Sequence, residues 1–405
     1  MRTHYGVSPW IDTFPRTRRP DHPRLRGEQT TEVVIVGGGL TGCATAYACA
    51  AAGLKPVLIE AERLGQGGAG RSAGLLLPEP GPAFRDVAKM HGLRKARGIF
   101  DAWRRASLEA AALIRRLGIS CGLEACDTIT VALRDDGKAL RGEQEAREDA
   151  GLDGRWANES MIRKAMGLEA SGGLRLGGGF ALDPYRVCLG LAAAAVKRGG
   201  TFFERSGVTK VRAGQKHVEV LVDGGIVRAQ TVVVCTGMAT AEFKPLRRHF
   251  KRRETYLVMT EPVPPATRKQ LSGRNLMISD TASPRHRIRW TRDHRLLVAG
   301  ADKDETPIRQ RDGLRVQRTG QLMYELLMMY PAISGLQPEY GWECSYGETT
   351  DGVMYIGPHR NYPRHLFALG GGGDSVTGAF LAARILARAA GGATDKGDAV
   401  FGWTR

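Results

Sequence analysis

The sequence lacks any hydrophobic run long enough to form a transmembrane helix. Its most apolar segments, around residues 42–54 and 187–196, are shorter than the roughly 20 residues that cross a bilayer. Residues 1–29 are rich in arginine and proline and contain no apolar signal core. We therefore expect a cytoplasmic protein in which this segment is an extended N-terminal arm lying on a folded domain.

Paired cysteines are also missing. The seven cysteines form an odd set without a Cys-x-x-Cys spacing, which argues against a disulfide framework and a structural zinc site and favours a reducing compartment. No Ser/His/Asp triad or pair of catalytic carboxylates stands out, and Glu145 and Glu148 are interpreted as a solvated helix face. The sequence thus predicts no metal site and little acid–base machinery.

Negative charge is scarce. Forty-two acidic residues against 59 basic ones give a net charge of +17, with a dense basic run at residues 244–253 and an arginine-rich zone at residues 285–295. Such a field attracts anionic partners. The favoured interpretation is a solvated basic face. A nucleic acid or an anionic partner protein stays open as an alternative, although the usual nucleic-acid-binding signatures are absent from the sequence.

Residues 32–42 carry the most informative pattern. An apolar, β-branched strand is followed by Gly-x-Gly-x-x-Gly, in which Gly37 makes the tight turn, Gly39 allows close approach to a pyrophosphate and Gly42 packs the next helix on the strand. A helix and a second strand then lead to Glu60, an acid placed to bind a ribose hydroxyl. Because all these elements occur in order, the sequence predicts a dinucleotide site.

A second glycine-rich loop follows at residues 64–75. A nicotinamide enzyme does not need such a loop, whereas a flavin enzyme must bring backbone close to the diphosphate and the isoalloxazine ring. The sequence therefore predicts FAD as the cofactor. A third glycine turn, residues 370–373, lies between a strand and a helix, whose positive end is suited to the flavin edge that becomes negative on reduction.

The remaining patterns predict an α/β fold in two domains. The strand at residues 231–237 ends in Thr236-Gly237, as expected where a parallel sheet meets a ligand, while residues 255–300 alternate apolar and polar like antiparallel strands. We expect a Rossmann-type FAD-binding domain with a parallel sheet and a substrate-binding domain with a mixed or antiparallel sheet. The former is assigned residues 30–90, 180–245 and 340–395, and the latter residues 91–179 and 246–339.

Taken together, these motifs resemble the FAD-dependent D-amino-acid oxidase superfamily, in the branch of glycine oxidase, sarcosine oxidase and gamma-glutamylputrescine oxidase. The resemblance runs from about residue 33 to 386. It is carried by Gly37–Gly42 with Glu60, Gly70–Gly74, Asp183-Pro184, Thr236-Gly237, Thr260-Glu261-Pro262, residues 293–297, Trp342–Pro358 and the terminal glycine turn.

The resemblance implies oxidation of the C–N bond of an amine or amino acid, with hydride transfer to flavin N5 and hydrolysis of the imine product. Oxygen or another acceptor would then remove the electrons. The cofactor contacts that it implies are Gly37, Gly39, Leu40, Thr41, Gly42, Glu60, Ala61, Arg63, Arg71, Ser72, Ala73, Gly74, Leu75, Val208, Thr236, Gly237, Cys344, Gly371, Gly372, Gly373, Asp374, Ser375, Val376 and Thr377.

Three departures or details concern the chemistry. Arg287 or Arg289 is expected to clamp a substrate carboxylate, with Tyr256 as a further pocket residue, although the strand register left open whether these arginines face solvent. Residues 296–301 offer no lysine like that of oxygen-reactive sarcosine oxidases, which leaves a dehydrogenase open. Cys344 begins a Cys-x-Tyr-x-x-Thr-x-Asp pattern that resembles the covalent flavin attachment of monomeric sarcosine oxidases, with a buried, unreactive thiol as the alternative.

Overall fold

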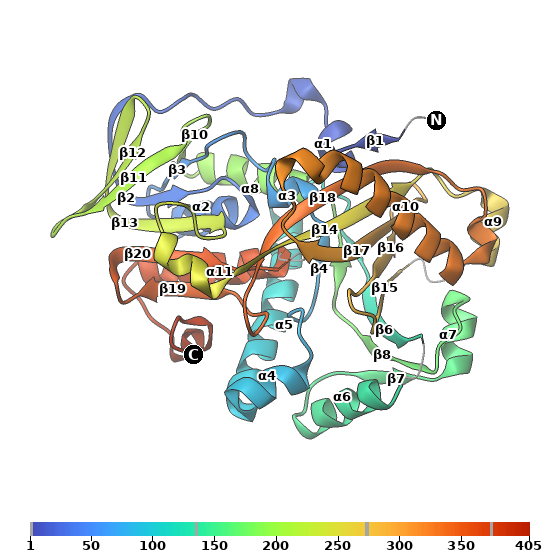
Figure 1. Ribbon diagram of the computed structural model, residues 1–405. Coiled ribbons are helices and arrows are strands. Elements are labelled where there is room, and N and C mark those ends of the chain that lie inside the picture. Colours follow the sequence, from blue (N-terminus) through green and yellow to red (C-terminus); the bar gives the residue numbers. More distant parts are fainter. Residues whose placement is uncertain (1–2, 134–136, 272–274, 373–375) are drawn as a thin grey trace.

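The structure is a computed structural model that describes residues 3–133, 137–271, 275–372 and 376–405. Two large sheets lie side by side, each covered by helices, so the predicted α/β class is confirmed (Figure 1). None of the helices in these ranges is long and apolar enough to span a bilayer. The seven cysteines are buried and form no disulfide.

The first sheet contains the predicted dinucleotide-binding unit. Its strand order is β10-β3-β2-β13-β12-β11, with β20 beside the end of β13 and β19 beside β20. The strands are β2 (Gly27–Val36), β3 (Val57–Ile59), β10 (Thr201–Phe203), β11 (Val208–Ala213), β12 (Val218–Val222), β13 (Gly225–Gly237), β19 (Tyr355–His359) and β20 (Tyr362–Leu369).

Helices α2 (Leu40–Ala51), α8 (Pro184–Val196), α5 (Leu93–Arg116) and α11 (Val376–Ala390) share the largest apolar core with this sheet. Because α2 packs against both α8 and α11, it is apolar almost all round. Asp183 caps helix α8 by accepting a hydrogen bond from the Arg186 N–H, and Pro184 occupies the first turn.

The second sheet has the order β1-β18-β14-β17-β16-β15-β6-β8-β7, mostly antiparallel as predicted. Helix α10 (Arg311–Met329) packs on one face, and the other face meets the loop after β3. Its strands are β1 (His4–Tyr5), β6 (Asp127–Ala132), β7 (Arg155–Ala157), β8 (Gly172–Leu176), β14 (Lys251–Thr260), β15 (Leu276–Asp280), β16 (Arg287–Trp290), β17 (Leu296–Asp304) and β18 (Pro338–Glu348).

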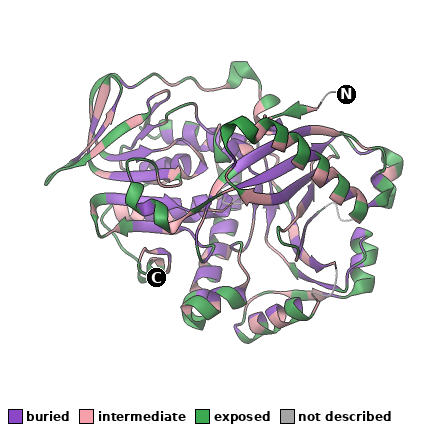
Figure 2. Ribbon diagram, in the orientation of Figure 1, coloured by how far each residue is buried: buried purple, intermediate pink, exposed green. Residues whose placement is uncertain are grey.

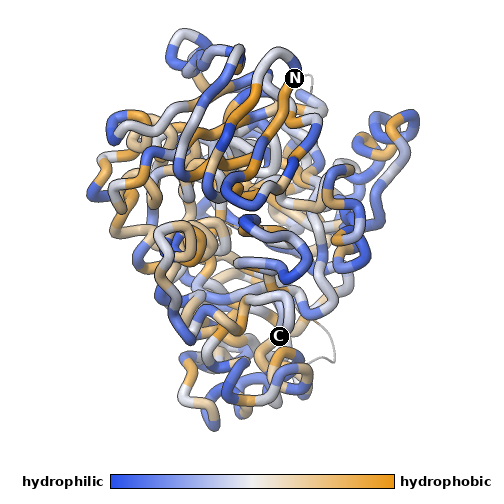
Figure 3. The backbone as a smooth tube through the Cα atoms, turned by 90° about the vertical axis from the view of Figure 1, so that its left-hand side faces the viewer, coloured by the Kyte–Doolittle hydropathy of each residue, from blue (hydrophilic) through white to orange (hydrophobic). Residues whose placement is uncertain are grey.

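The inner strands are buried, whereas the outer helices present exposed faces (Figure 2). Figure 3 shows that hydrophobic and hydrophilic stretches alternate along the backbone. A small sheet joins β4 (Leu75–Leu76), β9 (Phe180–Ala181) and β5 (Glu124–Ala125). The shorter helices are α1 (Pro9–Asp12), α3 (Gly68–Arg71), α4 (Phe84–His91), α6 (Gly137–Asp149), α7 (Glu159–Met166), α9 (Pro265–Gln270), η1 (Arg16–Arg18), η2 (Lys244–His249), η3 (Ile308–Gln310), η4 (Pro331–Ile333) and η5 (Lys396–Phe401).

The structure shifts two of the expected domain boundaries. Strand β18 pairs with β14 in the second sheet, so the chain returns to the first sheet after residue 348 and not at residue 340. Helix α5, expected in the substrate-binding domain, packs against α11 in the core of the first sheet. Hydrophobic periodicity indicates that a helix or strand has an apolar face, but it does not show against which sheet that face packs. Both boundaries were therefore misplaced.

Candidate functional site

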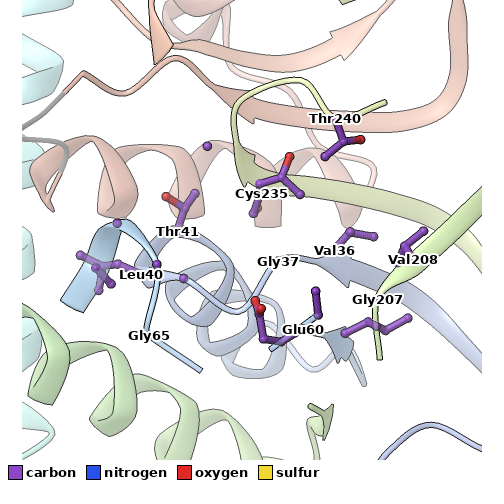
Figure 4. A pocket seen from close by; sticks show the side chains of 18 of the residues that line it. Val36, Gly37, Leu40, Thr41, Glu60, Gly65, Gly207, Val208, Cys235 and Thr240 are labelled. Carbon is purple, nitrogen blue, oxygen red and sulfur yellow. The ribbon is translucent and has the colours of Figure 1, made fainter. Parts of the chain in front are cut away.

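A cavity of about 600 Å³ opens at the carboxyl ends of β2, β3 and β13, where the dinucleotide site was expected (Figure 4). Its walls combine the glycine turn before α2, the end of β3 and the segments around β11 and β13. The predicted cofactor residues on this lining are Gly37, Gly39, Leu40, Thr41, Glu60, Ala61, Arg63, Ser72, Val208, Thr236, Gly237 and Val376.

The three glycines of the first turn have separate roles. Gly37 has φ +106°, and a Cβ there would lie 2.7 Å from the Cys235 carbonyl oxygen. A Cβ on Gly42 would lie 1.8 Å from the Gly37 carbonyl oxygen, so this residue permits the helix to pack on the turn. A Cβ on Gly39 would meet no atom within 4 Å, because it would project into open space. The turn therefore leaves room for a pyrophosphate against its backbone, and FAD fits this site.

Glu60 lines the cavity beside the glycine turn. Its Oε2 accepts a hydrogen bond from the Gly38 N–H at 2.6 Å, and its Oε1 accepts one from the Glu62 N–H at 2.8 Å. These bonds fix the carboxylate at the end of β3, and each oxygen keeps a lone pair for a ribose hydroxyl.

The carbonyls of the loop from Gly70 to Gly74 are all held from outside. The Trp342 indole donates to the Arg71 carbonyl at 2.8 Å, the Trp10 indole to Ser72 at 3.0 Å, and Arg289 Nε to Ala73 at 2.9 Å. The Ser8 hydroxyl donates to the first carbonyl of the series and the Leu182 N–H to the last. Because these acceptors are satisfied elsewhere, the loop is held rigidly against the cofactor cavity.

Several other predicted cofactor residues do not line this cavity. The Arg71 guanidinium pairs with Glu343 at 3.4 Å, and the Thr377 hydroxyl donates to the Leu77 carbonyl at 2.7 Å. Ala73, Leu75 and Cys344 lie in the apolar cluster between the loop and the second sheet. A Cβ on Gly74 would lie 2.2 Å from the Leu182 carbonyl oxygen. Residues Gly373, Asp374 and Ser375 lie outside the described residues.

A second cavity, of about 950 Å³, extends from Gly371 and Gly372 to the second sheet. We call it the flavin-end cavity. Arg285 and Arg287 line it at the start of β16, Asp302 lines it from β17 and Tyr346 from β18. The Tyr346 hydroxyl donates to Asp302 Oδ2 at 2.8 Å, and burial raises the pKa of this phenol, so it stays protonated at neutral pH.

The two arginines of β16 lie on the same face of the sheet but have different environments. Arg287 lies opposite Ala299 and lines the flavin-end cavity. Arg289 is 5% exposed and donates to the carbonyls of Ala73 and Leu182, so its predicted role as a carboxylate clamp is replaced by a structural one. Burial lowers the pKa of this guanidinium to about 10.

Tyr256 does not face the flavin-end cavity either. Its ring packs in the core beneath α10, and its hydroxyl donates to Glu254 Oε2 at 3.1 Å. Burial raises the pKa of Tyr256 to about 12. Because side chains alternate along a strand, Leu257 and Met259, and not Tyr256, lie on the face toward the Gly70–Gly74 loop. The prediction that Tyr256 is a substrate-pocket residue is therefore corrected.

A charged cluster supports the strand that carries Arg287. His286 Nδ1 lies 2.6 Å from Asp280 Oδ2, and Nε2 lies 2.9 Å from Glu325 Oε2 on α10. The hydrogen bond to Asp280, opposed by burial, raises the pKa of His286 to about 9. The imidazole is therefore charged at neutral pH and joins β15, β16 and α10.

Some arginines of the two basic zones are paired with acidic side chains. Arg252 pairs with Glu305 at 2.9 Å and Arg253 with Asp304 at 2.7 Å, while Arg295 binds Glu339. The predicted cofactor contacts omit further residues that line the cofactor cavity. Gly65, Gly67, Gly68 and Ala69 belong to the glycine-rich loop at residues 64–75, which the sequence indicated as a whole, whereas the segments after β10 and β13 follow no recognised motif. The other missed lining residues are Val36, Ile59, Ser206, Gly207, Thr209, Val211, Cys235, Thr240, Ala241, Glu242, Phe243 and Ala379.

The comparisons with known proteins agree with this geometry. Gamma-glutamylputrescine oxidoreductase of Escherichia coli is 26% identical over 91% of this chain and 86% of its own length. Glycine oxidase of Bacillus subtilis is 27% identical over 84% and 87%. A solved glycine oxidase from Geobacillus kaustophilus has a TM-score of 0.75 at 18% identity and covers 93% of this chain and 99% of that one. Residues 32–389 match the model of the FAD dependent oxidoreductase (DAO) family, and the chain belongs to that family.

Proposed function

We propose that this enzyme oxidises the C–N bond of an amine or amino acid that carries an anionic group beside that bond. The observation that carries the proposal is the position of Arg287 on the wall of the flavin-end cavity that also contains Gly371 and Gly372. When bound, FAD supplies the acceptor for a hydride from the carbon next to nitrogen. The protein contributes orientation and charge.

The side chains of the flavin-end cavity offer both halves of such a recognition. The Arg287 guanidinium can donate two parallel hydrogen bonds to a carboxylate. Asp302 lines the same cavity and supplies negative charge for a substrate ammonium group. Tyr346 fixes that carboxylate through its hydroxyl. Arg287 lies on β16 and Asp302 on the neighbouring β17. Because their charges are opposite, Arg287 binds the carboxylate of a zwitterionic substrate and Asp302 its ammonium group.

The test is a panel of amines and amino acids under anaerobic conditions, with bleaching of the flavin spectrum as the readout. Carboxylated amines should reduce the flavin faster than their amide or decarboxylated analogues. Arg287→Ala should raise KM for them by 10- to 100-fold with a smaller change in kcat, since a charged hydrogen bond contributes about 1.5–3 kcal/mol. The control is Arg292→Ala, which removes an exposed arginine paired with Glu124. Equal reduction by neutral analogues would refute the anionic requirement.

We further propose that Cys344 binds the flavin covalently. The thiol is buried on β18, within the apolar cluster that includes Ala73 and Leu75 of the glycine-rich loop at residues 64–75. Tyr346 and Thr349, which follow it in the Cys-x-Tyr-x-x-Thr-x-Asp pattern, line the flavin-end cavity. Formation of the thioether would break the S–H bond of Cys344 and one C–H bond of the 8α-methyl group and form one C–S bond. The two protons would be released, and the two electrons would reduce the flavin, which the electron acceptor then reoxidises.

Acid denaturation separates this bond from simple burial. Pelleted wild-type protein should stay yellow, and Cys344→Ala should release its flavin into the supernatant. A colourless wild-type pellet would identify the thiol as a buried apolar group that packs behind the cofactor.

A further inference from the structure

A surface groove of about 560 Å³ lies beside the flavin-end cavity, between β19, the end of η2 and the segment around η5. Arg248 and His249 line both the groove and the cavity. His359, Arg360 and Trp403 complete the basic and aromatic part of its wall. We call this site the basic–aromatic groove. Arg248 and His249 belong to the basic run of residues 244–253, which the proposed chemistry does not use.

A series of aromatic rings connects the two spaces. Phe250 lines the flavin-end cavity, and a Cβ on Gly370 would lie 2.8 Å from its ring. The Phe250 and Tyr355 ring centroids are 5.9 Å apart, and Tyr355 stacks on Trp403 at 4.5 Å with 7° between the planes. Both separations are typical of rings in contact. The rings therefore form a continuous route from the glycine turn to the groove.

The stack ends at the groove. Arg405 covers the other side of Tyr355, with its guanidinium carbon 3.9 Å from the ring centroid. Within the described residues, Trp403 stacks in parallel with Tyr355 alone, and its contacts with His249, Phe250, His359 and Phe367 are edge-on. Trp403 also lines the groove and is partly exposed, so a planar ligand ring can contact it there.

The charge of the groove favours an anion. Arg248 and Arg360 make no ion pair with an acidic side chain in the part of the chain that the structure describes. The acids of the groove, Asp395 and Asp398, are bound to Arg388 at 2.7 and 2.8 Å. Burial and the neighbouring basic groups lower the pKa of His359, in keeping with a positive field.

We propose that the basic–aromatic groove binds a planar anionic quinone that receives the electrons of the reduced FAD through the ring series. The quinone ring stacks on Trp403, and its anionic substituent pairs with Arg248 and Arg360. Two electrons and one proton leave the reduced flavin, and a second proton comes from water, so that the quinone becomes a hydroquinone. The inference requires bound FAD but not the amine substrate.

Binding is tested with 1,2-naphthoquinone-4-sulfonate and the oxidised holoenzyme by equilibrium dialysis, with neutral 1,4-naphthoquinone as the second probe. Trp403→Ala should weaken binding of both quinones at least tenfold, and Trp403→Phe should restore it. Arg248→Ala combined with Arg360→Ala should weaken only the sulfonate. The matched control removes two exposed arginines elsewhere, Arg94→Ala with Arg309→Ala. Equal affinities in wild type and variants would overturn the proposal.

Electron transfer is tested without any amine. FAD is photoreduced anaerobically, and its reoxidation by the sulfonated quinone is followed by absorbance. The rate should fall at least tenfold in the Trp403→Ala and double-arginine variants and stay unchanged in the control. FAD content and near-ultraviolet circular dichroism identify misfolded variants. If binding is lost but reoxidation is not, electrons leave elsewhere and the proposal fails. A failed amine panel with intact quinone reoxidation would instead refute the proposed substrate.

Discussion

The two ends of the FAD site are built differently. The cavity at the ends of β2 and β3 is shaped by backbone, with Gly37, Gly39 and Gly42 setting its turn. The flavin-end cavity is shaped by charged side chains such as Arg287 and Asp302, which come from the other sheet. We propose that the first end binds the pyrophosphate of FAD and that the second selects the substrate. A Cβ should therefore disrupt the first, and a change of charge should disrupt the second.

Gly42→Val tests the backbone end at its most crowded point and should have the largest effect. The new Cβ would overlap the Gly37 carbonyl oxygen, 1.8 Å away, so α2 could not dock on β2. We expect a loss of about 3 kcal/mol or more in unfolding free energy and no bound FAD. Urea denaturation and absorbance at 450 nm measure these effects. Gly98→Ala on α5, where a Cβ meets nothing within 4 Å, is the control and should keep both properties.

Gly39→Val tests whether a side chain at this position blocks FAD binding without changing the stability of the folded apoprotein. A Cβ at this position meets no protein atom within 4 Å, so the apoprotein should keep its melting temperature within about 2 °C. The side chain would occupy the space of the pyrophosphate, and FAD affinity should fall at least about 100-fold, or ~3 kcal/mol. Isothermal titration of the apoprotein with FAD measures this. A melting temperature that falls as far as in Gly42→Val would contradict the separation.

Arg289→Met and Arg287→Met compare two arginines on one face of β16. Removing the buried Arg289 leaves the Ala73 and Leu182 carbonyls without their donor and should cost about 2–3 kcal/mol of stability, with faster FAD release. Arg287→Met should leave stability within about 0.5 kcal/mol and change KM instead. Denaturation curves and KM values for both variants are the measurements. Equal losses of stability would show that the two arginines share one role.

The smallest effect is expected from pH. The pKa of His286 is raised from 6.5 to about 9, so its contribution to stability is complete below pH 6.5 and is lost as pH rises through 9. Between pH 7 and 10 the wild type should lose about 1–2 kcal/mol more than His286→Gln. Melting temperatures of both proteins across this range provide the test. Parallel pH profiles would show that the cluster with Asp280 and Glu325 does not hold the charged form.

The sequence predicted the backbone end well because its determinants are local. The glycine turn and Glu60 lie within 24 residues of one another, from 37 to 60, and periodicity placed the strands between them. The antiparallel strands predicted within residues 255–300 are likewise confirmed. Local patterns were sufficient wherever partners are close in the chain.

The flavin end was predicted less well because its determinants are contacts between distant segments. Arg287 and Arg289 have the same local pattern, and only the carbonyls of Ala73 and Leu182 distinguish them. Tyr256 was misplaced because a shift of one residue in β14 exchanges the two faces of the strand. The clamp by Trp10 and Trp342 had no sequence signal.

The clamped loop also bears on the order of folding. Its carbonyls from Arg71 to Ala73 depend on partners 62, 216 and 271 residues away in the chain. Contacts of such long range form slowly, because loop-closure entropy opposes them until much of the protein has collapsed. The loop from Gly70 to Gly74 is therefore expected to reach its final conformation only after Trp342 has been synthesised and packed against it. We expect FAD to bind at a late stage of folding, after both sheets have formed.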